Sequence, residues 1–197
     1  INKDDLKACY LKYGFGSKTG FTMNREEAGS IDYTYQIEAA TAGYGQGITT
    51  TPIQHLQALT IISNNGTMLK PYIIDKIVDT DTGKTIYKGK SKKVGTVVSS
   101  TTVTKMKELM ASVINGDNTN STGYLYHMDG YSLIGKTGTA QKIPRSAGTY
   151  IVSFCGFAPV ENPQVLVYVV IDEIQRDSQT NLSLIHISEP TRLGMIS

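Results

Sequence analysis

Two copies of the tripeptide Lys-Thr-Gly contain residue types that could bind a ligand or take part in a reaction. They lie in GSKTGFT at residues 16–22 and in GKTGTAQ at residues 135–141. A lysine ammonium can pair with a carboxylate, a threonine hydroxyl can donate a hydrogen bond, and a glycine lets a ligand approach the backbone closely. Because both copies have the same three residues, only the elements that position them can distinguish a binding site from a turn.

The second copy lies in a predicted β-strand. The run YSLIGKTGTAQ at 131–141 is followed by two further strand-like runs, TYIVSFCGFAP at 149–159 and PQVLVYVVIDE at 163–173. Their short connections predict that the three strands are antiparallel neighbours. If the first strand lies at the edge of the sheet, its free N–H and C=O groups can pair with a bound peptide as with another strand.

At such an edge each residue of the second copy has a distinct use. Lys136 would bring a cation to a ligand carboxylate, Thr137 would offer a hydroxyl, and Gly138 would let the ligand approach. The N–H of Thr139 could point at a developing oxyanion, and Gln141 could line the cleft. The alternative is that residues 136–138 form only a solvated strand edge and a turn, and the tripeptide by itself favours that alternative.

The first copy, residues 18–20, does not lie in a predicted strand. It leaves a glycine-rich turn and continues into FTMNREEAG without the alternating pattern of a strand. We therefore predict a structural role for this copy.

Helices and a hairpin are predicted before the three strands. Apolar spacing and end signals predict helices over 4–13, within 32–47, over 51–66 and over 99–116. In the third helix Thr51 is the expected N-cap and Pro52 suits the first turn. Two strand-like runs within 71–88, around Asp81, Thr82 and Gly83, predict an exposed β-hairpin. Helices followed by an antiparallel three-strand meander indicate an α+β fold.

Composition excludes several classes of partner. The 19 Lys and Arg residues nearly balance the 17 Asp and Glu residues, which argues against a nucleic-acid partner. The longest apolar run, at 165–171, is too short to span a membrane, and residue 1 does not begin a signal-peptide pattern. Cys9 and Cys155 fit neither a disulfide framework nor a metal-ligand spacing, so both are expected to be buried as small apolar residues.

Four segments, in order, resemble the transpeptidase domain of class B penicillin-binding proteins. They are AGYGQGITTTPIQHLQALTIISNNGTMLKP at 42–71, GKTGTAQ at 135–141, SFCGFAPVENP at 153–163 and VYVVIDE at 167–173, and the resemblance extends from Leu11 to Glu173. It implies part of a serine β-lactamase/transpeptidase-like fold, of which this chain holds the three C-terminal strands of an antiparallel sheet. It also implies a D,D-transpeptidase that cross-links peptidoglycan stem peptides and is acylated by β-lactam antibiotics.

The resemblance implies roles for the second copy as well. Lys136 and Thr137 would hold the terminal carboxylate of the substrate or drug, and the N–H of Thr139 would form half of the oxyanion hole. No cofactor and no metal are implied. The parent protein would act on the extracytoplasmic face of the bacterial cell membrane, anchored through an absent N-terminal segment, with division or elongation machinery as further partners.

The sequence departs from the family pattern in its nucleophile. No Ser-x-x-Lys motif occurs in the 197 residues, and the Ser-x-Asn letters at Ser63 align with a helix terminus of the family instead of the catalytic motif. We therefore expect residues 1–182 to be the C-terminal part of a transpeptidase domain and to be inactive alone. Residues 183–197, SLIHISEPTRLGMIS, resemble a read-through tail that is not native, so His186 within it needs no functional explanation.

Other polar residues and two other functions stay open at this point. His55 and His127 have no partners at a spacing typical of a triad or a metal site, and Tyr124 and Tyr126 could rim the cleft or simply pack. A serine β-lactamase or penicillin sensor would share the Lys-Thr-Gly wall. A non-catalytic module could use the same edge strand to dock a peptide.

Overall fold

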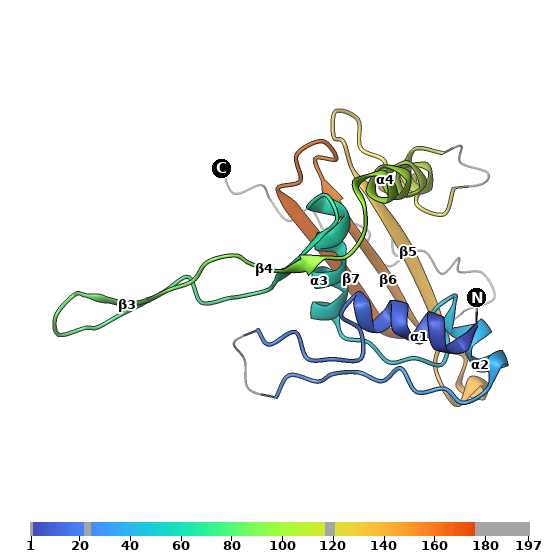
Figure 1. Ribbon diagram of the computed structural model, residues 1–197. Helices are drawn as coiled ribbons and strands as arrows, with labels where there is room; N and C mark the ends of the chain where they lie inside the picture. The colour runs from blue at the N-terminus through green and yellow to red at the C-terminus, as the bar shows by residue number, and fades with distance from the viewer. Residues whose placement is uncertain (1, 22–24, 117–120, 176–197) are drawn as a thin grey trace. The chain divides into compact units, whose positions relative to one another are not determined.

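The computed structural model describes residues 2–21, 25–116 and 121–175 of the chain (Figure 1). The chain divides into two compact units, residues 1–106 and residues 107–197. The expected read-through tail at 183–197 lies outside the described residues.

The first unit contains three helices before its ribbon. In α1 (Lys3–Lys12) the Asn2 side chain accepts hydrogen bonds from the N–H groups of Asp4 and Asp5. The second helix, α2, covers Gln36–Ala42, which is shorter than the predicted range. In α3 (Pro52–Ser63) Thr51 and Gln54 form a reciprocal capping box, which confirms the predicted N-terminus.

A two-stranded antiparallel ribbon follows α3. Its base pairs β1 (Thr67–Lys70) with β4 (Lys92–Thr96), and its far end pairs β2 (Lys76–Val78) with β3 (Thr85–Lys88). The far end is the predicted hairpin, and its strand residues are exposed as expected. The β1–β4 pairing was not predicted, because its two strands are separated by the whole hairpin and neither has a clear alternating pattern.

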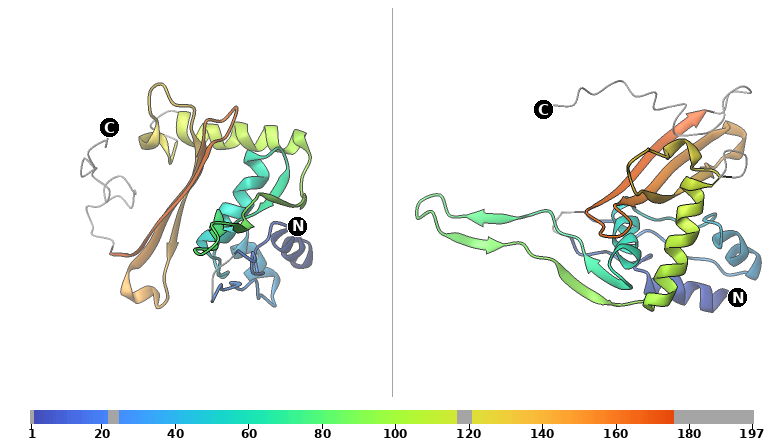
Figure 2. Two further views of the ribbon diagram at one scale, coloured as in Figure 1. Left: turned by 90° about the vertical axis from the view of Figure 1, so that its left-hand side faces the viewer. Right: turned by 90° about the horizontal axis from the view of Figure 1, so that it is seen from above.

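The second unit contains the predicted meander. Helix α4 (Ser100–Asn115) leads from the first unit into the second, and the strands are β5 (Ile134–Gln141), β6 (Thr149–Ala158) and β7 (Val165–Gln175). Short 3-10 turns cover Tyr124–Tyr126 and Arg145–Ala147. The strands form one antiparallel sheet in the order β5-β6-β7, which confirms the predicted topology, and Figure 2 shows them as one layer.

One face of this sheet carries the core of the second unit. Val152 and Phe154 of β6 pack with Ile114 of α4, and each of the three has a buried side chain. Partly buried apolar residues surround this cluster, namely Val113, Tyr126, Leu133, Ile171 and Ile174. Because β5 pairs with β6 along its whole length, this core fixes the position of the Lys-Thr-Gly strand.

Candidate active site

The second Lys-Thr-Gly copy lies on a strand at the edge of its sheet. β5 pairs with β6 on one side, and no strand of the described ranges pairs with its other side. All five residues singled out in the sequence lie on β5, namely Lys136, Thr137, Gly138, Thr139 and Gln141. The edge placement on which their proposed use depends is therefore present.

Lys136 and Gly138 share one face of the sheet with polar residues of the neighbouring strands. Lys136 lies directly opposite Cys155, and Cys155 lies opposite Tyr168 of β7. The exposed Lys136 ammonium donates a hydrogen bond of 2.8 Å to the carbonyl oxygen of Thr137. This ammonium is thus held against the strand that carries it.

Thr137 and Thr139 lie on the opposite face. The Thr137 hydroxyl donates to the Thr122 hydroxyl, with 3.0 Å between the two oxygens. Thr139 is exposed and lies opposite the buried Val152. Sequence reasoning did not identify Thr122, because nothing in its polar loop distinguishes it from its neighbours.

Gly138 has a structural requirement of its own. A Cβ atom added at this position would lie 2.6 Å from Ser153 Oγ, on the opposite residue of β6. The closest constraint on Gly138 is therefore the neighbouring strand, in addition to any ligand that approaches the edge. The sequence offered only the ligand as a reason for this glycine.

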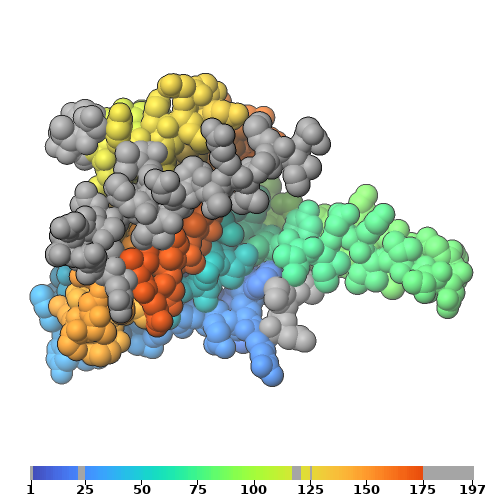
Figure 3. All heavy atoms as spheres, turned by 180° about the vertical axis from the view of Figure 1, so that it is seen from behind, coloured from blue at the N-terminus to red at the C-terminus, as the bar shows by residue number. Residues whose placement is uncertain are grey.

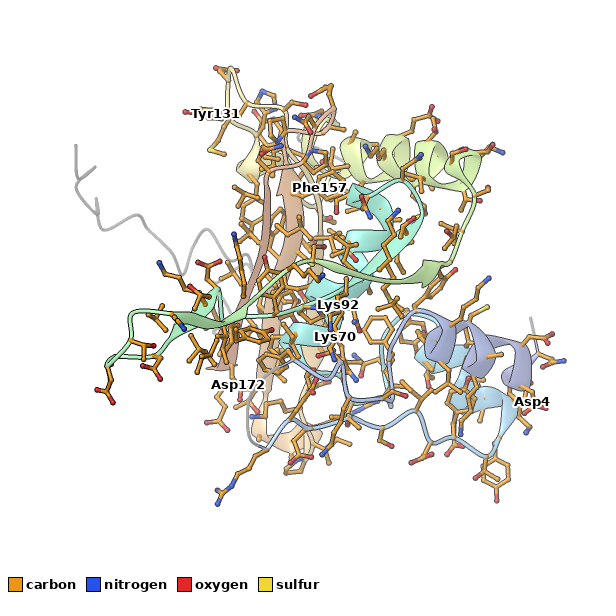
Figure 4. All side chains as sticks on the ribbon, turned by 60° about the vertical axis from the view of Figure 1, so that its left-hand side comes forward. Asp4, Lys70, Lys92, Tyr131, Phe157 and Asp172 are labelled. Carbon is orange, nitrogen blue, oxygen red and sulfur yellow. The ribbon has the colours of Figure 1, made fainter. Side chains whose placement is uncertain are left out.

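The end of β5 is fixed by two sets of polar contacts that the sequence did not indicate. The Gln141 side-chain amide donates to Arg145 O at 3.1 Å, within the turn that leads to β6. The Lys142 ammonium lies 2.9 Å from carboxylate oxygens of both Asp172 and Glu173, and Figure 4 labels Asp172. Hydrogen bonds to Asp172 and then to Glu173 raise the pKa of Lys142.

The first Lys-Thr-Gly copy, in the first unit, already holds a carboxylate of its own chain. Glu26 accepts hydrogen bonds from the Thr19 N–H and the Thr19 hydroxyl, both at 2.6 Å, and from the Gly20 N–H at 2.9 Å. Desolvation raises the pKa of Glu26, but these hydrogen bonds and the charge of Lys18 outweigh it and lower the pKa. This copy therefore closes a loop, in agreement with the structural role that was predicted for it.

The remaining candidate residues have packing or turn contacts. Ser63 ends α3, and its hydroxyl donates to Thr60 O at 3.4 Å. His55 lies 2.8 Å from the Thr50 hydroxyl, and burial lowers the pKa of its ring. His127 lies between Asn115 and Asp129 at the surface. The Tyr126 ring packs on Phe154, whereas Tyr124 is exposed.

The expectation that both cysteines are buried was wrong. Cys9 and Cys155 are free thiols of intermediate exposure. Cys155 is nevertheless surrounded closely enough that desolvation raises its pKa to about 11. Within the described ranges no three His, Cys, Asp or Glu side chains group as metal ligands would. In the same ranges no helix has the length and apolar character needed to cross a bilayer.

Comparison with known proteins identifies the family. Residues 1–185 match the model of the penicillin binding protein transpeptidase domain. The chain belongs to the class B penicillin-binding protein transpeptidase family. The segments that carried the resemblance in the sequence, including the strand of the second Lys-Thr-Gly copy, all lie within the matched range.

Relatives and solved structures of this transpeptidase family agree with the assignment. The chain is 36% identical over 178 residues to stage V sporulation protein D of Bacillus subtilis, covering 87% of this chain and 27% of that protein. It is 32% identical over 158 residues to the peptidoglycan D,D-transpeptidase FtsI homolog of Mesostigma viride, covering 73% and 26%. Penicillin-binding protein 3 of Mycobacterium tuberculosis, complexed with aztreonam, has a TM-score of 0.77 at 27% identity, covering 86% and 40%.

These matches also show how much of its relatives' length the chain covers. The chain spans about a quarter of the length of the curated relatives, 27% and 26% for the two named here. The predicted α+β fold, with its antiparallel three-strand sheet, is confirmed as part of a transpeptidase fold.

Proposed function

We propose that this chain supplies the Lys-Thr-Gly wall of a peptidoglycan D,D-transpeptidase that works through a serine acyl-enzyme. The observation that carries the proposal is the position of Lys136–Thr139 on a sheet edge with no neighbouring strand in the described residues, inside a family match over residues 1–185. A stem peptide or a β-lactam would lie along this edge.

The backbone of β5 supports the proposed oxyanion donor. Thr137 and Thr139 are two residues apart in a strand, so their N–H and C=O groups point to the same side. The Lys136 ammonium reaches Thr137 O, so the backbone groups on that side of β5 are accessible to a ligand. The Thr139 N–H would then donate to the oxygen that becomes negative in the tetrahedral intermediate, and the N–H of the nucleophilic serine would donate from the other side.

The side chains would bind the terminal carboxylate. The Lys136 ammonium donates to the backbone carbonyl of Thr137, so it can turn to a ligand carboxylate at the cost of that hydrogen bond. The Thr137 hydroxyl, which donates to the Thr122 hydroxyl, would instead donate to the same carboxylate. Gly138 would let the peptide lie close to the strand, and Gln141 would line the end of the cleft.

The reaction would proceed in two acyl transfers. The serine oxygen attacks the penultimate D-alanine carbonyl, the bond to the last D-alanine breaks, and that residue leaves as the free amine after protonation. An amine of a second stem peptide then attacks the ester and releases the serine. In this proposal residues 1–182 are the C-terminal part of the domain, and the serine comes from a Ser-x-x-Lys motif outside them.

The same proposal covers location and partners. The parent protein would be membrane-anchored, with its transpeptidase domain on the extracytoplasmic face, and would bind β-lactams and division or elongation machinery. Residues 183–197 would be a non-native tail, which the genomic sequence of the locus would test directly.

Labelling with a fluorescent penicillin tests the proposal. The 197-residue chain should remain unlabelled, whereas the full-length gene product should be labelled covalently. Lys136→Ala in the full-length protein should slow labelling by about tenfold or more, because the carboxylate of the bound penicillin loses its charge partner. Lys105→Ala, which removes an exposed lysine of α4, is the matched control and should have no effect.

Three outcomes would overturn the proposal. Covalent labelling of the 197-residue chain would contradict an external nucleophile. Rapid nitrocefin hydrolysis by the full-length protein would favour a β-lactamase. A full-length gene without a Ser-x-x-Lys motif would favour a peptide-binding module.

A further inference from the structure

The ribbon of the first unit, residues 67–96, has a charge unlike that of the rest of the chain. Seven lysines and three aspartates give it a net charge of +4, whereas the whole chain has +2, so all other residues together carry −2. The lysines are Lys70, Lys76, Lys84, Lys88, Lys90, Lys92 and Lys93. Residues 80–88, at the far end of the ribbon, are all exposed, and Figure 3 shows this part of the chain in green.

Lysines face each other directly across the ribbon at two places. Lys70 of β1 lies opposite Lys92 of β4, and Figure 4 labels both. Lys76 of β2 lies opposite Lys88 of β3. Like charges at directly opposed positions destabilise a β-ladder, so the ribbon keeps two unfavourable pairs that a single substitution in each would remove.

The ribbon lysines form no ion pair with carboxylates of the described residues. Asp79, at the start of the turn between β2 and β3, accepts from the N–H groups of Asp81 and Thr82 and from the Thr82 hydroxyl. The positive charge of the ribbon is therefore free to attract an anionic partner.

Apolar side chains and open backbone edges accompany the charge. Ile77 and Tyr87 lie opposite each other with 42% and 43% of their surfaces exposed, and Ile86 is 67% exposed. Each of the four strands pairs with only one other strand of the described residues. A two-stranded ribbon of this kind presents unpaired backbone groups along both edges, and exposed apolar residues beside them mark a contact surface.

We propose that the ribbon binds an extended segment of a partner protein in which acidic and apolar residues alternate. Such a segment would add a strand to one edge, place its carboxylates beside the opposed lysines and cover the Ile77–Tyr87 pair. A polypeptide satisfies all three features, because it alone brings backbone donors and acceptors to the open edge. A polyphosphate or an anionic membrane surface could pair with the lysines, but neither brings backbone donors and acceptors to the open edge.

Fluorescence anisotropy with a defined probe tests this proposal. The probe is a labelled peptide in which glutamate and valine alternate, titrated with the whole chain at physiological salt. Lys88→Glu should weaken binding by about tenfold, because it removes one charge and adds the opposite one. Lys105→Glu makes the same charge change on α4 and should alter binding by less than about twofold.

Two further arms separate strand addition from general charge attraction. Lys88→Glu places an opposite charge across from Lys76, so the ribbon keeps its fold, and circular dichroism checks this. A probe with alternate backbone amides methylated keeps its charge but should lose binding. Equal binding of the methylated probe, an unchanged affinity of Lys88→Glu, or binding only to polyphosphate or phosphatidylglycerol vesicles would overturn the proposal.

Discussion

Gly138 and Ser153 face each other across β5 and β6 so closely that a Cβ on the glycine would lie 2.6 Å from Ser153 Oγ. This contact gives the glycine of the Lys-Thr-Gly strand a packing role that can be separated from ligand binding. Gly138→Ala should lower the free energy of unfolding by about 1 kcal/mol, because the short serine hydroxyl can rotate away. Chemical denaturation measures the change.

A double-mutant cycle provides the control for that contact. Ser153→Ala removes the obstructing oxygen, so Gly138→Ala should cost little in the Ser153→Ala background. Additive effects of the two substitutions would show that the contact does not constrain Gly138. The same double variant can be made in the full-length protein. If it is stable but is still labelled poorly by penicillin, ligand binding itself also requires a glycine at this position.

Glu26 should make the loop of the first Lys-Thr-Gly copy sensitive to acid. Its pKa is lower in the folded state than in the unfolded state, so its stabilising effect is complete above the ordinary glutamate pKa of 4.5 and is lost as the pH falls through the folded value. The protection factors for hydrogen exchange of the Thr19 and Gly20 amides should fall in that acidic range. In the Glu26→Gln variant these two amides should exchange faster already at pH 7. In the Glu27→Gln variant they should exchange at the wild-type rate.

The Cys155 thiol should react slowly with alkylating reagents although its side chain is not fully buried. Its pKa of about 11, against an ordinary value of 9.0, leaves about a hundredfold less thiolate at pH 8 than an ordinary cysteine would have. Iodoacetamide should therefore alkylate Cys155 about a hundredfold more slowly in the native protein than in the urea-unfolded chain. Mass spectrometry of the Cys155 peptide measures both rates, and equal rates would contradict the raised pKa.

Gln54 should be among the most costly polar residues to replace in the first unit. Its side chain is fully buried, accepts from the Thr51 N–H and donates to Ser17 O and Ala28 O at 2.8 and 2.7 Å. Gln54→Ala leaves those carbonyls without their donor, so thermal denaturation should show a loss of about 2–4 kcal/mol. Gln57→Ala removes one long hydrogen bond, to Leu69 O, and should cost less. A larger loss from Gln57→Ala would refute this ranking.

The sequence by itself determined the elements whose signals are local. Thr51 and Pro52 mark the start of α3 because a cap and its partner are three residues apart, and alternation with short turns identifies the β5–β6–β7 meander. The family followed from the same segments, and the comparisons confirm it. The roles of Lys136, Thr137, Gly138, Thr139 and Gln141 remain predictions drawn from that resemblance.

Only the tertiary structure decided which partners meet across long stretches of chain. It placed β5 at the sheet margin, paired β1 with β4 across the hairpin, and brought Ser153 against Gly138. It also showed that Glu26 occupies the first Lys-Thr-Gly copy, which explains why two identical tripeptides differ. The physical reason is that such contacts depend on packing and register between distant residues, which no local pattern specifies.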